Sequence, residues 1–96
     1  MSHPDANLKR VRAFWASLYA HDFEAVASHI AEDGLYEDVP APDAGAVGPD
    51  NVVRRLRIGF DDIERHEHEV HRMVAQGDTV VTEHTERWFW PTGSTI

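Results

Sequence analysis

The chain has 96 residues, of which 42% are hydrophobic and 27% charged, so we expect one globular domain spanning residues 1–96. Its net charge of −8 argues against a nucleic-acid partner, because such proteins neutralise phosphates with Lys and Arg. The sequence has no cysteine, no apolar run long enough for a membrane helix and no signal-peptide pattern at its start, which predicts a cytoplasmic protein without disulfides or a membrane partner.

Two amphipathic helices are predicted at the start of the chain. The first runs from about Pro4 to Ala20, because apolar residues recur there at helical spacing. Asp22 is expected to cap a second, shorter helix, and Gly34 is expected to end it. A short junction joins the two, so they should form a helical hairpin. The apolar stripe of the first helix consists of Leu8, Val11, Phe14, Trp15 and Leu18.

The remaining elements are a short strand, a third helix and two long strands. The run Leu35–Val39 is predicted to be extended, and Pro40–Gly48 is loop by composition. Pro49 opens the third helix. From Arg65 to Trp90 the apolar period changes to two, with a tight hairpin turn at Gly77–Asp78. The order ααβαββ predicts an α+β domain whose helices cover one face of a sheet.

The end of the sequence predicts the start of another strand. Thr92–Gly93 has the composition of a second hairpin turn, and an extended segment follows it. Without a neighbour, the long apolar strand before this turn would be an exposed edge. We therefore expect a partner strand that the 96 residues do not contain, supplied by a longer chain or by another chain.

Tyr36 and Asp38 form the first candidate site. They are two residues apart in an extended run, so a strand would project the phenol and the carboxylate from one face. Behind helices that roof a cavity, such a pair can hold a water or a small polar ligand. The structural alternative is a strand end with a surface acid.

The second candidate site is on the second long strand. Alternation places His84 and Glu86 on the face that carries Trp88 and Trp90, and we expect the face with two Trp residues to point inward. A partly buried acid has a raised pKa and can donate a proton near neutral pH. A cross-strand ion pair or a hydrogen-bonded buried histidine is the structural alternative.

The first long strand carries three histidines, a residue type that commonly binds zinc: His66, His68 and His71. A zinc site needs three or four converging ligands. Counting back from the hairpin turn places His71 opposite His84 and His66 near Phe89, a register that does not gather His66, His68 and His84. We therefore expect no metal site.

Basic residues cluster in the predicted third helix, at Arg54, Arg55 and Arg57. On a helix these side chains spread around the exposed arc. We interpret the cluster as a solvated face. No Gly-rich phosphate loop, nucleophile elbow or Ser/His/Asp pattern is present.

Two regions of the chain resemble limonene-1,2-epoxide hydrolases of the nuclear-transport-factor-2-like (SnoaL-like) superfamily. The first is Leu35–Pro42 followed by Gly48–Val52, and the second is Val81–Glu86 followed by Pro91–Gly93. The resemblance covers nearly the whole chain in element order. It implies a cone in which a curved mixed sheet wraps helices around a deep apolar pocket, with the last strands of the family fold missing. It also implies a homodimer and catalysis without a cofactor or metal.

The family's functional residues map onto four positions of this sequence. In the family a Tyr and an Asn hold the attacking water, an Asp is the general base, and an Arg links this base to a second Asp that protonates the epoxide oxygen. Tyr36 matches the Tyr, and Asp38 stands where the family has Asn. His84 occupies the Arg position and Glu86 the acid position, while the family's base lies beyond residue 96. An ionised Asp38 only accepts hydrogen bonds and could itself take a proton from water.

The resemblance predicts a cofactor-independent epoxide hydrolase-like protein. Tyr36 and Asp38 would bind and activate water, Glu86 would be the acid, and His84 would orient the pair. The substrate would be a small lipophilic epoxide. The alternative is a non-catalytic small-molecule-binding or dimerisation module of the same fold. The expected apolar ligand contacts are Trp15, Leu18, Leu56, Phe60, Trp88 and Trp90.

Ketosteroid isomerases share the superfamily and provide a second alternative, proton transfer with Asp38 as the base. In those enzymes a Tyr on the first helix donates a hydrogen bond to the oxyanion of the reacting substrate. This Tyr aligns with Phe14, which cannot donate a hydrogen bond. Tyr19 is one turn away and is expected on a different arc of that helix.

Overall fold

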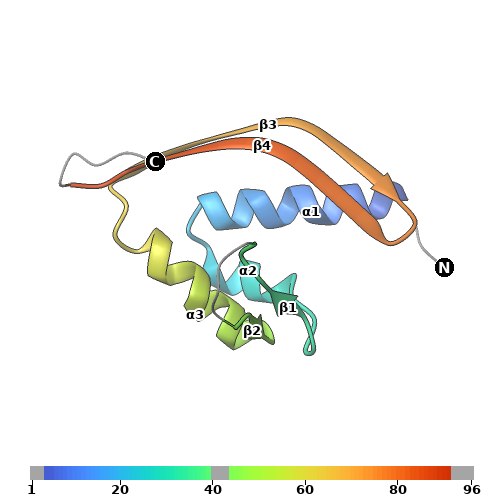
Figure 1. The fold of residues 1–96 in the computed structure, drawn as a ribbon, viewed down its shortest axis with the longest axis horizontal. Coiled ribbons are helices and arrows are strands. Elements are labelled where there is room, and N and C mark those ends of the chain that lie inside the picture. The colour runs from blue at the N-terminus through green and yellow to red at the C-terminus, as the bar shows by residue number, and fades with distance from the viewer. Residues whose placement is uncertain (1–3, 40–43, 92–96) are drawn as a thin grey trace.

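The computed structural model describes residues 4–39 and 44–91, where the elements follow the order ααββαββ. The predicted α+β class is confirmed, with one short strand more than predicted. The elements are α1 (Pro4–Tyr19), α2 (Phe23–Ser28), β1 (Leu35–Tyr36), β2 (Ala46–Val47), α3 (Pro49–Phe60), β3 (Arg65–Gln76) and β4 (Thr79–Phe89). In Figure 1 the β3–β4 hairpin arches along one side of α1, and α2, α3 and the β1–β2 pair lie on its other side.

The helical hairpin forms as predicted, but its second helix is shorter. Asp22 caps α2, and its Oδ1 accepts a hydrogen bond from the Ala25 N–H at 3.2 Å. The prediction that Gly34 ends this helix was wrong, because α2 ends at Ser28 with His29 as its C-cap. The Ser28 hydroxyl donates to the Ala25 carbonyl at 2.6 Å, a local bond of the kind that competes with further helix.

Replacing the cap, Asp22→Ala, is expected to lower the free energy of unfolding by about 1 kcal/mol, since the first turn of α2 loses an acceptor for its free N–H groups. Urea unfolding followed by circular dichroism measures the change. Asp33→Ala is the matched control, because Asp33 is exposed in the loop after α2. An equal loss in both variants would show that the cap contributes nothing specific.

The β1–β2 pair replaces part of the predicted loop. Leu35 pairs with Val47 and Tyr36 with Ala46, so β1 is shorter than the predicted run to Val39, and residues 40–43 lie outside the described ranges. A Cβ at Gly45 would lie 2.6 Å from the Tyr36 carbonyl oxygen, so only glycine permits this close approach. β2 in turn contacts α3, and Asp38, two residues after Tyr36, lies 3.7 Å from Arg55 of that helix.

The β3–β4 hairpin begins in the predicted register and then departs from it. Gln76 pairs with Thr79 across the turn, where Gly77 has a φ of 57°. A bulge between Val70 and Arg72 shifts the pairing by one residue, so Val70 rather than His71 lies opposite His84. The predicted His71–His84 pairing was therefore wrong. The same shift places His66 opposite Trp88 and His68 opposite Glu86, with both histidines on the face toward α1.

The core lies where the three helices meet, with Trp88 of β4 and the following Trp90 packed against it. Both strand pairs of the described ranges are antiparallel. None of the helices in those ranges combines the length and apolar character that a membrane span requires. The buried core residues are Leu18, Val26, Val52, Leu56, Phe60 and Ile63.

Candidate functional site

A cavity of about 340 Å³ lies between α1, α3, the segment after β1 and the inner face of β4. Its size and apolar walls are typical of a small-molecule site. The indole N–H of Trp88 is buried and has no hydrogen-bond partner among the described residues. The apolar walls include five of the six expected ligand contacts, Trp15, Leu18, Leu56, Phe60 and Trp88, together with Phe14; Trp90 does not line the cavity.

Tyr36 and Asp38 lie together in the cavity wall. The Tyr36 hydroxyl donates a hydrogen bond to Asp38 Oδ1 at 2.6 Å, and Arg55 Nη2 is 3.7 Å from Asp38 Oδ2. Burial, the hydrogen bond to Asp38 and the Asp38 charge together raise the pKa of Tyr36 to about 12, although the Arg55 charge lowers it somewhat. The phenol therefore stays neutral at physiological pH, and its oxygen can accept a hydrogen bond from a water.

The Tyr36–Asp38 contact predicts a specific titration. The chain has two tyrosines, so tyrosinate absorbance in a Tyr19→Phe background reports Tyr36 alone. We expect ionisation near pH 12 in that background. Adding Asp38→Ala should lower the pKa toward its ordinary value of about 10, because the hydrogen bond and the negative charge are both lost. Adding Glu37→Ala instead is the control and should leave the titration unchanged; an unchanged titration with Asp38→Ala would contradict the contact.

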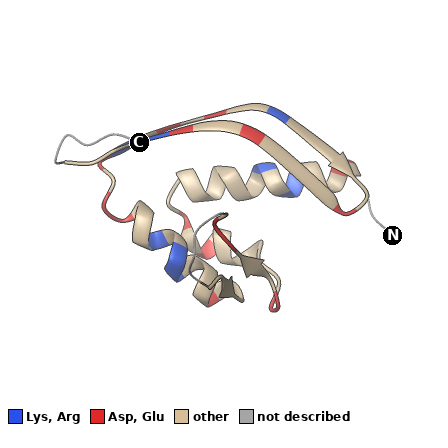
Figure 2. Cartoon of the chain, viewed as in Figure 1, with Lys and Arg blue, Asp and Glu red and all other residues tan. Residues whose placement is uncertain are grey.

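Arg55 is a cavity residue that the sequence interpretation placed on a solvated face. Figure 2 shows basic residues on α3, but Arg55 differs from its neighbours because its side chain is only 24% exposed. Its Nη1 donates to the Ala44 carbonyl at 3.3 Å while Nη2 approaches Asp38. Its position three residues after the buried Val52 and directly before the buried Leu56 is the sequence signal that could have identified it.

Glu86 lines the same cavity from β4, as its shared face with Trp88 predicted. The carboxyl is half-buried, and burial raises the pKa of Glu86 above its ordinary value. The Tyr19 hydroxyl donates a hydrogen bond to Glu86 Oε1. Tyr19 is a second residue that sequence reasoning missed, because the arc of α1 that faces β4 depends on how the two elements pack.

His84 does not line the cavity. Its Nδ1 is 2.8 Å from Nε2 of His68, and its ring lies against Trp15 at a centroid distance of 4.6 Å. Burial lowers the pKa of both histidines, and neighbouring histidines add to this effect. No contact joins His84 to Asp38 or Glu86 in the described ranges, so the structure does not make the expected link between these two carboxylates through His84.

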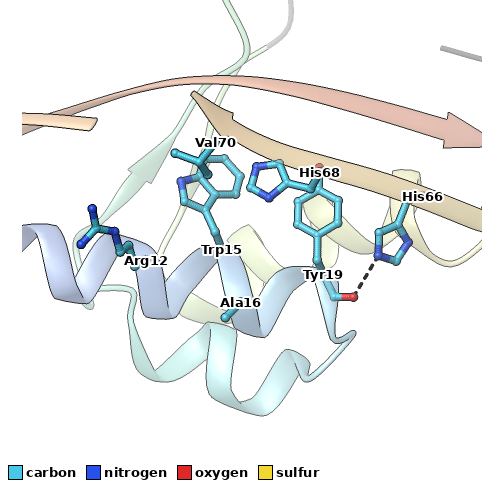
Figure 3. Close-up of a pocket in the computed structure, with 7 residues that line it drawn as sticks. All are labelled: Arg12, Trp15, Ala16, Tyr19, His66, His68 and Val70. Carbon is cyan, nitrogen blue, oxygen red and sulfur yellow. Dashed lines mark hydrogen bonds between the residues drawn. The ribbon is translucent and has the colours of Figure 1, made fainter. Parts of the chain in front are cut away.

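A second, more open recess of about 570 Å³ lies between α1 and β3 (Figure 3). His66 donates from Nε2 to the Tyr19 carbonyl oxygen at 3.0 Å, and His68 stacks on the Tyr19 ring. Across the described part of the chain, no three side chains of His, Asp or Glu are grouped so that they could hold a metal ion. The recess is lined by Arg12, Trp15, Ala16, Tyr19, His66, His68 and Val70.

Residues 11–96 match the SnoaL-like domain family. Among solved structures, an LEH-like epoxide hydrolase from Mycobacterium tuberculosis is 26% identical with a TM-score of 0.76, and the match covers 92% of this chain and 64% of that chain. This chain therefore spans less than two thirds of the length of that enzyme. No functionally curated protein is significantly similar to the sequence.

Two further structures share the fold at lower identity. A protein described as a SnoaL-like polyketide cyclase from Shewanella putrefaciens is 16% identical over 99% of this chain and 72% of that chain, with a TM-score of 0.81. A protein with a ketosteroid isomerase-like fold from Catenulispora acidiphila, in complex with trimethylamine, is 20% identical over 91% of this chain and 67% of that chain, with a TM-score of 0.77. With its order of helices and antiparallel strands and the match over residues 11–96, the chain belongs to the SnoaL-like domain family.

Proposed function

We propose that this protein hydrolyses a small lipophilic epoxide by water attack, without a cofactor. The observation that carries the proposal is the hydrogen-bonded Tyr36–Asp38 pair in the wall of an apolar cavity that also holds the half-buried Glu86. A water site and a proton donor on one cavity are the two groups that epoxide opening needs. The similarity to an LEH-like epoxide hydrolase supports the same reaction class.

In the proposed reaction Asp38 takes a proton from a water that is also hydrogen-bonded to the Tyr36 oxygen. The water oxygen forms a bond to one epoxide carbon while the bond from that carbon to the ring oxygen breaks. Glu86 gives its proton to the ring oxygen, and the product is a vicinal diol. Asp38 then carries a proton from the water and Glu86 is left ionised, and proton exchange with solvent restores both groups.

The other walls support a polar reaction in an apolar cavity. Arg55 places a positive charge beside Asp38, which holds the carboxylate in the cavity wall. The apolar side chains favour a lipophilic substrate, and the cavity volume favours a small one.

A non-catalytic binding module of the same fold is the alternative. The observation that favours it is the position of His84, which contacts His68 and Trp15 instead of linking the two carboxylates. Such a module would keep the apolar cavity and bind a lipophilic ligand without changing it. Both functions therefore predict binding of a lipophilic ligand, and only the hydrolase predicts its conversion to a product.

The experiment that distinguishes the hydrolase from the binding module is incubation of the purified protein with limonene-1,2-epoxide in water enriched in oxygen-18. We expect a diol that carries one labelled oxygen, at a rate above that of buffer. Saturable binding with diol formation at the buffer rate would overturn the hydrolase proposal in favour of the binding module. A heat-denatured sample controls for spontaneous opening.

A further inference from the structure

We propose that Tyr19 is the positioning residue of Glu86: it fixes the orientation of the carboxyl and stabilises the ionised form. The Tyr19 hydroxyl donates to Glu86 Oε1 across the gap between α1 and β4. The role of this contact in epoxide opening rests on the proposed function. The contact and its effect on the acid are testable without any substrate.

The Tyr19 ring is held by neighbours on several sides. It stacks on His68 with a centroid distance of 4.2 Å and an interplanar angle of 5°, and it meets Phe60 edge-on at 5.3 Å. The His66 ring lies at 4.8 Å. Figure 3 shows the phenol between α1 and β3, beside both histidines. A ring packed in this way has few alternative rotamers, so its hydroxyl stays directed at one oxygen of Glu86.

The backbone of Tyr19 is fixed as well. Tyr19 is the last residue of α1, where carbonyl groups lack helical partners. His66 Nε2 lies 3.0 Å from the Tyr19 carbonyl oxygen, and because a carbonyl only accepts, this nitrogen carries the proton. The chain then turns at His21, which has a φ of 58°. Tyr19 is therefore fixed at both its ring and its backbone, as a positioning residue requires.

The hydrogen bond determines which oxygen of Glu86 carries the proton. When the acid is neutral, Oε1 accepts from Tyr19, so the proton is placed on Oε2. When the proton has left, the phenol donates a charge-assisted bond to the carboxylate, which stabilises the ionised form. Tyr19 thus counteracts the burial that raises the pKa of Glu86. The other titratable groups around the carboxyl are His68 opposite it on β3, His84 on β4, and Tyr36, Asp38 and Arg55 in the cavity wall.

The test is Tyr19→Phe, which keeps the ring and removes the hydroxyl. Side-chain carboxyl NMR of the labelled protein follows the titration of Glu86 directly. We expect the pKa of Glu86 to rise by about one unit, since a hydrogen bond to a charged group is lost. With the epoxide, the alkaline limb of the kcat/KM profile should move up by the same amount, and kcat should fall by about tenfold because the acid is weaker. Tyr36→Phe is the matched control, and it should leave the Glu86 titration near its wild-type position.

His66→Ala is the second variant, and it leaves both Tyr19 and the acid in place. It should raise the pKa of Glu86 by less than Tyr19→Phe does, because Tyr19 loses the hydrogen bond at its backbone carbonyl but keeps the hydroxyl that donates to Glu86. An unchanged Glu86 titration in both variants would overturn the positioning role. If the Glu86 titration shifts in these variants but the wild-type protein forms no diol, the Tyr19–Glu86 coupling is supported and only the proposed hydrolase function is contradicted.

Discussion

Glu86→Gln is expected to lower kcat/KM for epoxide opening by about 100- to 10,000-fold, the usual contribution of a positioned general acid. The amide has nearly the shape of the carboxyl and can still accept from Tyr19, but it has no acidic proton to transfer. The half-buried position beside Trp88 and the raised pKa are what make Glu86 suitable as the donor. Without it the opening ring would release an unprotonated alkoxide into an apolar cavity.

Diol formation measured at fixed pH with a range of epoxide concentrations provides the values of kcat and KM. Glu83→Gln is the matched control, because Glu83 lies on the opposite face of β4 and pairs with Arg72 on the surface at 3.3 Å. We expect Glu83→Gln to retain wild-type turnover and Glu86→Gln to retain KM while losing kcat. Equal turnover in all three proteins would remove Glu86 from the mechanism.

The pH dependence of both activity and stability follows from the raised pKa of Glu86. As an acid the residue must be protonated, so activity should fall as pH rises through its folded-state pKa. The folded protein also binds this proton more tightly than the unfolded chain does. The corresponding stability is present below the ordinary Glu pKa and is lost as pH rises through the folded value. Glu86→Gln cannot titrate, so it removes both the alkaline limb and this loss of stability.

The fold was predictable where local sequence decides the element. The apolar stripe of α1, the Asp22 cap, Pro49 at the start of α3 and the Gly77–Asp78 turn are all local signals, and each is confirmed. The short β1–β2 pair is different, because it depends on contacts between distant segments. One of these is the bond from the Gly48 N–H to the Gly34 carbonyl at 2.8 Å. Such contacts leave no periodic pattern.

The inner face of β4 was predictable for the same reason, whereas the polar contacts around it were not. Strand alternation was enough to place Glu86 and Trp88 on the inner face. The bulge after Val70 has no signature in the hydrophobic pattern, so the side-chain hydrogen bond between His68 and His84 could not be anticipated. Tyr19 and Arg55 were missed because a helix offers several arcs, and packing alone selects the one that faces a cavity.

Asp38→Asn is also expected to have a large effect, lowering kcat by at least about 100-fold. An amide can hold a water and accept from the Tyr36 hydroxyl, but it cannot take the proton of the attacking water. The resemblance to limonene-1,2-epoxide hydrolases makes the result informative, since that family has Asn at this position and its base elsewhere. Here the carboxylate is bound by Tyr36 at 2.6 Å and lies 3.7 Å from Arg55, so its removal also disturbs the charge of the site.

Single-turnover diol formation and substrate binding should be compared in the wild type, Asp38→Asn and Glu37→Gln. Glu37 is the exposed neighbour of Asp38, and its variant controls for a change of charge in this segment. Loss of turnover with binding retained in Asp38→Asn alone would identify Asp38 as the base. If Asp38→Asn instead keeps its turnover, Asp38 only holds the water. Another group would then have to accept the proton of the water, as in the family that the sequence resembles.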